Sequence, residues 1–528
     1  MEMKRRTLLS YLAALPAAAE VLSFGSAAFA AEEGGNLVVG LRTSEPRHLN
    51  PAVTTVGGVQ LIGANIYSAL TRFDMNGTPV PDLAQSWDIS TDGLVYTFHL
   101  APGIKWHDGK PFTSADVKFS FEKVLLPLHP VGKVNFSAID TIETPDDNTV
   151  VFKLKYAYAP FIQLLEVRHA TILPKHIYDG TDIMQNPANT APIGTGPFKL
   201  AEWSKGNFLR LEKNADYFKK DRPHLDELVF VIIPDTNTMV AAMEAEQIDF
   251  APLGVSFDLV ETLKTRLGPK GWVIGTASYL FRGTGSVLFN LDDPTLCKLE
   301  VRQAIAHLIR KDEILSTVRK NVGKIADNPI SWYVPNDQTG VSYKPDAAKA
   351  NALLDAAGLP KKADGMRFAL SIVVSTGWAE YEPIANLMRD WFREAGIDLQ
   401  IQKMDEAAAI DKMFTARDFQ LGLCNPSFGP DPAIMAKGFT AAMVGQGAYT
   451  NGMGYKNATV DALFDQGVKQ VDPAERYATY QKIVQAVMTD LPVVPLYEDD
   501  FAYAYRKAFT GLPPGGTHRD SYENVEKA

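Results

Sequence analysis

The residues of this chain that could do chemistry are not arranged in any familiar catalytic pattern. The sequence has no GxSxG turn for a serine nucleophile, no HExxH helix for zinc, and neither a GxxxxGKS/T nor a GxGxxG loop for phosphate. His107 and Asp108 stand in a glycine-flanked segment, where a hydrogen-bonded turn histidine is commoner than a metal ligand. A secreted hydrolase is therefore a distant alternative, since only a pair of well-placed carboxylates could supply its chemistry.

Two further patterns could hold a ligand, and each has a simpler explanation. In the Gly-Thr-Gly-Pro run at residues 194–197 the proline lacks an N–H donor and no lysine follows, so we expect a chain crossover rather than a phosphate loop. The nine histidines are scattered, and the two cysteines, Cys297 and Cys424, are compatible with a disulfide or with buried free thiols. We predict neither a metal site nor a cofactor.

The charge balance limits the classes of partner. Lys and Arg number 52 against 62 Asp and Glu, a net charge of −10, so the chain has no basic excess for nucleic acid or anionic lipid. With 46% hydrophobic and 22% charged residues, the composition is that of a globular protein with a sizeable core.

The first thirty residues have the composition of an export signal. A basic Lys-Arg-Arg run at residues 4–6 precedes an alanine-rich apolar stretch that ends in Ala-Phe-Ala at residues 28–30. The paired arginines fit both the Sec and the twin-arginine route. Because Pro16 and Glu20 interrupt the apolar stretch, we expect cleavage and release into the periplasm rather than a direct membrane anchor.

Hydrophobic periodicity predicts strands alternating with helices, which is typical of an α/β fold. The predicted strands cover residues 36–41, 95–100, 150–154, 228–233, 286–290, 368–374 and 397–401. The predicted helices cover residues 59–70, a segment starting near 114, 236–247, 301–315, 346–358 and 379–395. The helix near 114 has capping-box spacing between Thr113 and Asp116, with Phe112 placed to staple its entry. Residues 368–401 have the order of one β-α-β unit.

One long stretch carries a recognisable series of short motifs. It runs from Tyr-Ser-Ala-Leu-Thr-Arg-Phe-Asp at residues 67–74, through Pro-Asp-Leu-Ala-Gln-Ser-Trp at 81–87 and Asp-Gly at 92–93, to Gly-Ile-Lys-Trp-His-Asp-Gly-Lys-Pro-Phe-Thr at 103–113. This stretch closely resembles the signature of the family 5 extracellular solute-binding proteins, the peptide, opine and nickel receptors of ABC importers. Further blocks at 193–198, 214–218, 301–306, 343–346 and 491–497 resemble the family in the same order, so the resemblance spans the mature chain.

The resemblance implies a two-lobed periplasmic binding protein fold with an extra α/β subdomain inserted in the first lobe. On this basis lobe I comprises residues 31–70, 190–283 and 497–528, the inserted subdomain comprises 71–189, and lobe II comprises 284–496. The implied protein is a receptor without enzyme activity, expected to be a monomer, that delivers its ligand to the permease subunits of an ABC importer. Nucleic acid is not an expected partner.

The same resemblance suggests where lobe I and the crossovers meet the ligand. Thr55 and Gly57 follow the first strand, in a segment that lines the cleft of peptide-binding members. Arg282, just before lobe II, could clamp a ligand carboxylate or form an interlobe salt bridge. Trp378 offers an indole face for stacking, or else belongs to the core.

The segment from Asn425 to Pro432 resembles the pocket segment of lobe II. Peptide receptors usually place an aspartate three positions before the acidic residue of the closing Asp-Pro pair, to bind the ligand ammonium; here that position is Phe428. Unless Asp431 turns inward, a peptide with a free N-terminus is disfavoured. Phe428 with Asn425 and Ser427 would instead stack on and hydrogen-bond to a neutral polar group.

These observations rank the functions. A periplasmic receptor for a peptide or peptide-like solute comes first, and the same receptor role for an opine or an oligosaccharide is its alternative. Nickel or haem binding is a minor alternative, because the histidines show no chelating pair.

Overall fold

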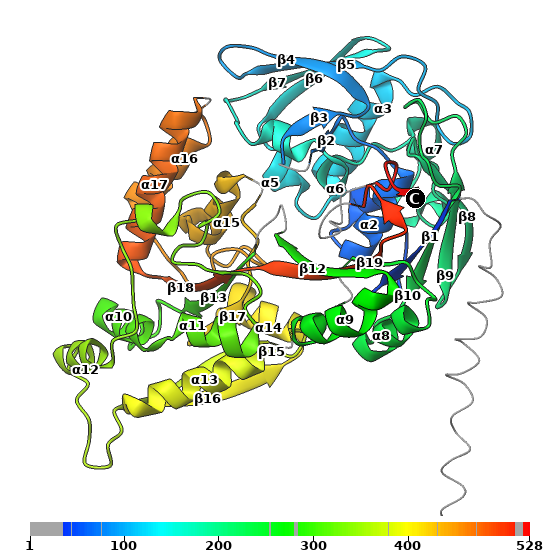
Figure 1. Ribbon diagram of the computed structural model, residues 1–528. Coiled ribbons are helices and arrows are strands. Elements are labelled where there is room, and N and C mark those ends of the chain that lie inside the picture. Colours follow the sequence, from blue (N-terminus) through cyan, green and yellow to red (C-terminus); the bar gives the residue numbers. More distant parts are fainter. Residues whose placement is uncertain are drawn as a thin grey trace, which may run out of the picture.

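The computed structural model describes residues 35–43, 45–74, 77–252, 255–278, 283–378, 380–429, 431–470, 472–512 and 521–528. The export signal predicted at residues 1–30 and the candidate clamp Arg282 lie outside these ranges. Across the described ranges, no helix is both long and apolar enough to cross a membrane. Three large sheets organise this part of the chain (Figure 1).

Lobe I is built on a seven-stranded sheet. In spatial order its strands are β12 (Trp272–Ser278), β19 (Asp500–Arg506), β11 (Phe250–Ala251), β1 (Asn36–Leu41), β10 (Glu227–Ile232), β9 (Phe208–Lys213) and β8 (Phe198–Ser204). Its helices are α2 (Gly57–Ile66), α8 (Thr236–Glu244) and α9 (Val260–Leu267). Leu37 and Val39 share a core with α2, whereas Val38 packs into a second core with α8. The alternation along β1 therefore buries both faces of the sheet.

The inserted subdomain has a four-stranded antiparallel sheet, β4 (Ala84–Ile89), β5 (Val95–Leu100), β7 (Thr149–Leu154) and β6 (Ile139–Asp146) in spatial order. Its helices are α3 (Ser114–Phe119), α4 (Leu126–Leu128), α5 (Gly132–Phe136), α6 (Val167–Ala170) and α7 (Lys175–Tyr178). The predicted capping box is present, since Thr113 and Asp116 cap each other's backbone N–H groups at the start of α3. Buried aromatic rings fill the space between the sheet and these helices, among them Phe98, Phe121 and Phe152.

Lobe II is built on a six-stranded sheet. In spatial order its strands are β14 (Lys324–Ile325), β18 (Val493–Glu498), β13 (Thr284–Phe289), β17 (Leu421–Cys424), β15 (Phe368–Ser375) and β16 (Ile397–Met404). Its helices are α10 (Leu299–Leu308), α11 (Lys311–Glu313), α12 (Ala347–Ala356), α13 (Tyr381–Glu394), α14 (Glu406–Ile410), α15 (Ala436–Phe439), α16 (Ala458–Gly467) and α17 (Pro473–Asp490). In the sequence α13 connects β15 to β16, and these two strands pair with each other in parallel, which confirms the predicted β-α-β unit.

Each predicted strand is present, but three predicted helices end early, and the one predicted over 236–247 is α8, which ends at Glu244. The helix predicted over 59–70 is α2, which ends at Ile66, where the Ile66 carbonyl accepts a hydrogen bond from Gly196 N at 2.8 Å. The helix predicted over 301–315 ends at Leu308, because Ile309 is extended. Beyond this end, Lys311 Nζ donates a hydrogen bond to Ala326 O at 2.8 Å. Tertiary hydrogen bonds, which hydrophobic periodicity does not report, set the C-terminal ends of α2 and α10.

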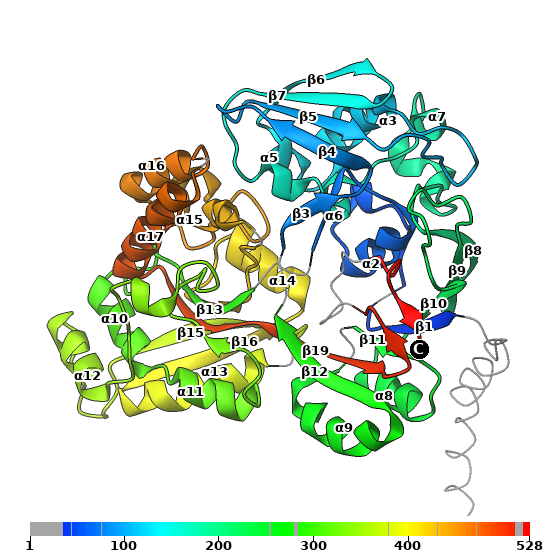
Figure 2. The same cartoon turned by 45° about the horizontal axis from the view of Figure 1, so that its top comes forward.

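Two crossovers join the lobes. The chain passes from β12 of lobe I to β13 of lobe II, and it returns from β18 to β19 through Asp499 (Figures 1 and 2). Strand β18 lies in the lobe II sheet as far as Glu498, two residues beyond the boundary that we placed at residue 496. On these sheets we propose the division into lobe I, inserted subdomain and lobe II given above, with the second crossover moved to Asp499.

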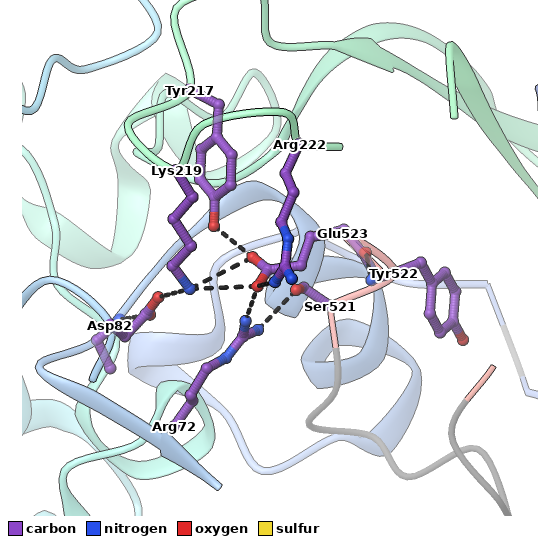
Figure 3. A network of polar contacts seen from close by, with 10 residues as sticks. Arg72, Asp82, Tyr217, Lys219, Arg222, Ser521, Tyr522 and Glu523 are labelled. Atoms are coloured by element: carbon purple, nitrogen blue, oxygen red, sulfur yellow. Dashed lines mark hydrogen bonds and ion pairs between the residues drawn. The ribbon is translucent and has the colours of Figure 1, made fainter. Parts of the chain in front are cut away.

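The C-terminal segment of lobe I is tied to the rest of that lobe and to Arg72 of the inserted subdomain by a buried ionic network (Figure 3). The Glu523 carboxylate, 1% exposed, pairs with Arg72, Lys219 and Arg222 and accepts a hydrogen bond from Tyr217 Oη at 2.5 Å. Burial would raise the pKa of this carboxyl, but the cations outweigh burial and lower the pKa to about 2. The network therefore stabilises the fold by charge compensation.

Candidate ligand-binding cleft

A cavity of about 1060 Å³ lies between the lobes. Lobe I contributes Thr55 to its wall, and the inserted subdomain contributes residues of α5 and α6 with the segment around Tyr158. Lobe II contributes the segment that follows β17, together with α15 and α16. The volume is at the upper end of the range for small-molecule sites and suits a ligand larger than a single sugar or amino acid.

The wall combines aromatic rings with exposed aliphatic groups. The rings belong to Tyr158, Tyr449, Phe464 and Tyr480. Val134 of α5, which lines the wall, is 56% exposed although it is a large apolar residue. Apolar groups left uncovered in a concave surface are typical of a binding site rather than of a folded core.

The lobes touch across the cavity, so the structure is a closed form. Ala159 N of the inserted subdomain donates a hydrogen bond to Val468 O of lobe II at 2.9 Å. Beside this contact, burial and the charge of Asp431 in lobe II raise the pKa of Tyr158 in the subdomain. Closure brings groups from distant parts of the sequence to one ligand.

Three of the predicted site residues line this cavity. They are Thr55, Asn425 and Ser427. Asn425 Nδ2 donates to Asp499 Oδ2 at 2.6 Å, which fixes the orientation of the amide. Its Oδ1 is buried against Gly283, where a Cβ would lie 2.2 Å from it, and has no hydrogen-bond partner among the described residues.

Asp431 does not turn inward to the cavity. Its carboxylate forms a bidentate pair with Arg476, at 2.6 and 2.9 Å, and it also accepts a hydrogen bond from Ala433 N at 2.8 Å. Asp431 is 4% exposed and does not line the wall of the cavity. It is therefore not free to bind a ligand ammonium.

Phe428 also lies away from the wall. It is 2% exposed and packs in the lobe II core, with its ring centroid 5.7 Å from that of Phe439. A Cβ on Gly438 would lie 3.1 Å from this ring, so α15 packs tightly against it. We therefore leave Phe428 out of the proposed site and assign aromatic contacts to the four rings named above.

Gly57 and Trp378 have other neighbours. Gly57 opens α2, and the close approach beside it is to protein rather than ligand, since a Cβ on Gly58 would lie 2.9 Å from the Thr43 side chain. Trp378 is half-buried against the lobe II core and stacks on Tyr381, with ring centroids 5.8 Å apart. Neither residue lines the cavity between the lobes.

A second charge network joins the cleft to the crossovers. The Arg319 guanidinium lies between the rings of Phe257 in lobe I and Tyr497 in lobe II, 4.3 and 4.1 Å from their centroids. It pairs with Asp499, the residue between β18 and β19, which also holds Asn425. A group at the cavity wall is thus connected to the hinge by one buried carboxylate.

The patterns that we explained without a ligand have structural roles. His107 Nε2 lies 3.0 Å from Gly196 O, and burial lowers the pKa of His107 to about 4. A Cβ on Gly194 would lie 1.8 Å from Ile66 O, which makes residues 194–197 a packed crossover. Cys297 is exposed and Cys424 is buried, both as free thiols. The described residues contain no group of three or more His, Cys, Asp or Glu able to hold a metal ion.

Sequence reasoning missed the two cations of the cavity. Arg168 of α6 and Lys437 of α15 both line its wall. Lys437 stands shortly after the end of the pocket segment at Pro432, and that position was its only available signal. Arg168 had none, because nothing in the sequence relates residues so far apart.

Known proteins share both the sequence and the fold of this chain. A family model for bacterial extracellular solute-binding proteins, family 5, middle, matches residues 78–446. The oligopeptide-binding protein AppA of Bacillus subtilis is 29% identical over 520 residues, covering 94% of this chain and 92% of its own.

Two solved structures extend the likeness to three dimensions. AppA of Bacillus subtilis in complex with a nonapeptide has a TM-score of 0.77 at 28% identity, covering 94% of this chain and 99% of its own. AgaA of A. tumefaciens R10 in complex with agropinic acid has a TM-score of 0.76 at 27% identity, with the same coverage.

Proposed function

Because this chain belongs to the family 5 extracellular solute-binding proteins of bacteria, we propose that it is an exported receptor that delivers a peptide or peptide-like solute to an ABC importer. The cavity of about 1060 Å³ between the closed lobes carries this proposal, because it is lined from both lobes by rings, aliphatic groups and a few polar groups. Burial between lobes ties ligand binding to closure, and the closed form is the one that a transporter could distinguish.

The remaining parts of the proposal concern the protein's surroundings. We propose that residues 1–30 are removed on export by the Sec or the twin-arginine route, and that the mature protein acts as a periplasmic monomer. Its partners are the permease subunits, contacted through both lobes. No enzyme activity is proposed, in keeping with the solute-binding role of the family.

An opine-type conjugate is the second candidate ligand. Phe428 stands at the position of the expected ammonium partner, and Asp431 is already paired with Arg476, so neither residue offers a free carboxylate to a ligand ammonium. AgaA, solved with agropinic acid, covers the same share of this chain as AppA, solved with a nonapeptide. A solute with acidic groups and no free terminal ammonium fits this wall.

Native mass spectrometry of the gently purified mature protein, beside a denatured sample, tests the proposal. Ligand-bound receptor should show an added mass that is released on denaturation, and fragmentation of that mass distinguishes a peptide ladder from a sugar-acid conjugate. If the protein is empty, a thermal-shift screen of peptides, opines and oligosaccharides follows, since a ligand bound only to the folded state raises its stability. Turnover of any of these solutes would overturn the receptor assignment.

A further inference from the structure

The cavity contains a buried positive charge that the protein itself does not neutralise. Lys437 of α15 is half-buried in the wall, and among the described residues no carboxylate lies within 4.0 Å of its ammonium. The Lys437 ammonium lies over the Phe428 ring, and the ring centroid is 6.0 Å from Nζ. A weak ring contact at that distance compensates little of the lost hydration of an ammonium group.

A second cation faces the same space from the opposite side of the cleft. Arg168 of α6 belongs to the inserted subdomain, whereas Lys437 belongs to lobe II. Burial and then the charge of Arg168 lower the pKa of Lys437 to about 8. Burial, followed by His169 and Arg168, lowers the pKa of nearby His129 to about 4. Arg168 and Lys437 thus bring two cations to this part of the cavity, with Glu166, which pairs with His169 at 2.6 Å, as an acidic neighbour.

Closure of the lobes brings Arg168 and Lys437 together, and like charges oppose that approach. An anion between them would reverse the sign of the interaction, because each cation would then attract the ligand. Such an anion binds the closed form better than the open form, which is the condition for a ligand to drive closure. A neutral ligand would leave the repulsion in place.

We infer that the cavity binds an anionic group of its ligand, a carboxylate, between Lys437 of lobe II and Arg168 of the inserted subdomain. The inference rests on the proposed receptor function and specifies its ligand class. It also reverses the expectation from peptide receptors, in which this pocket segment provides a carboxylate for a ligand ammonium. Here the segment places Phe428 in the core and pairs Asp431 with Arg476, and α15, which follows the segment, contributes Lys437 to the cavity wall.

The acidic groups of the wall do not cancel this site. Asp461 and Asp465 both belong to α16, and neither is within ion-pair distance of Lys437. Asp461 Oδ1 accepts a hydrogen bond from Ala441 N at 3.1 Å. These carboxylates can receive a cationic or hydrogen-donating part of a ligand whose acidic group lies at Lys437.

Paired probes test the inference. We would measure binding by calorimetry for mixed tri- to pentapeptides with a free C-terminal carboxylate and for the same peptides as carboxamides. A second pair would be an N-carboxyalkyl amino acid of the opine type and its amide, and maltotriose would be the neutral sugar. Within each class that binds, the carboxylate form should bind at least tenfold more tightly than the amide.

The variants assign that preference to the two cations. Lys437→Gln and Arg168→Gln should each reduce the carboxylate preference to less than about threefold, while Arg168→Lys should keep most of it. Lys482→Gln, which removes an exposed lysine of the same lobe outside the cavity, is the matched control and should change nothing. Unfolding temperatures of all variants show that each is folded.

The outcomes separate this inference from the proposed function. Binding of opine-type acids but not peptides would support the inference and overturn the peptide ligand. Equal affinity for acid and amide, binding of maltotriose alone, or an unchanged preference in Lys437→Gln would overturn the inference while leaving the receptor role intact.

Discussion

The Glu523 network of lobe I and the Lys437–Arg168 pair of the cavity are both partly or fully buried, yet they treat charge in opposite ways. Glu523 has three cations and a tyrosine hydroxyl around it, and its pKa falls to about 2. Lys437 has a second cation nearby and no carboxylate within ion-pair distance among the described residues, and its pKa falls to about 8. In both groups the shift measures how well the charged form is stabilised. The first network stabilises the fold, whereas Lys437, by our inference, keeps its charge for a ligand anion.

The largest effect should come from breaking the compensated network. Glu523→Gln leaves three cations without their shared carboxylate and should lower the free energy of unfolding by about 3 kcal/mol. Chemical denaturation measures this value. The control is Glu526→Gln, which removes an exposed carboxylate of the same C-terminal segment and should change stability by less than about 0.5 kcal/mol. Similar small effects for both variants would contradict the assigned role of Glu523.

The same network predicts an acid dependence of stability. The pKa of Glu523 falls from 4.5 in the unfolded chain to about 2 in the folded protein, so its contribution is fully present above about pH 4.5. As the pH falls towards 2 the folded carboxylate takes up its proton and the contribution is lost. The difference in unfolding free energy between wild type and Glu523→Gln should shrink over this interval. A difference that stays constant would show that the stabilisation is not ionic.

A compensated cation within lobe II sharpens the contrast with Lys437. Asp431→Asn should cost about 2 kcal/mol, because Arg476 would lose a bidentate partner that is almost fully buried. Asp418→Asn breaks an exposed pair with Lys412 and should cost less than about 0.5 kcal/mol. Thermal unfolding compares the two variants. A large loss of stability in the Asp418 variant would remove the distinction between buried and exposed pairs.

The smallest effect is expected at the uncompensated cation, with the opposite sign. Lys437→Met removes a charge that the protein does not neutralise, so the ligand-free protein should gain up to about 1 kcal/mol of stability. Lys482→Met at an exposed position is the reference. Unfolding of ligand-free samples, after denaturation and refolding to remove bound solute, provides the measurement. A loss of more than about 1 kcal/mol would show that Lys437 supports the fold rather than the ligand.

Local signals predicted much of the secondary structure because their causes are local. The alternating apolar residues of 368–374 and 397–401 became the parallel strands β15 and β16. The Thr113 and Asp116 spacing became a capping box. Each of these features depends on neighbours within a few positions or on the period of one element. The ends of α2 and α10 were missed because hydrogen bonds with distant segments lie there, from Gly196 N to Ile66 O and from Lys311 Nζ to Ala326 O.

The binding site was harder to predict, because side-chain direction after a strand end depends on packing. Asn425 and Ser427 line the cavity as predicted, whereas Phe428, next in the chain, packs against Phe439 and α15. Burial of an aromatic ring stabilises a protein strongly, but the sequence pattern alone does not show in which direction the ring points. Arg168 entered the site only because lobe closure carries the subdomain to lobe II.

The sequence by itself determined the family, the α/β class and the elements that build the lobes, because ordered motifs and hydrophobic period survive in one dimension. Tertiary structure alone decided which charges are neutralised. Asp431 meets Arg476, and Glu523 meets Arg72, Lys219 and Arg222, across long stretches of chain, while Lys437 is left beside Arg168. Coulomb interactions depend on distance in space and on burial, and neither quantity can be obtained from spacing along the chain.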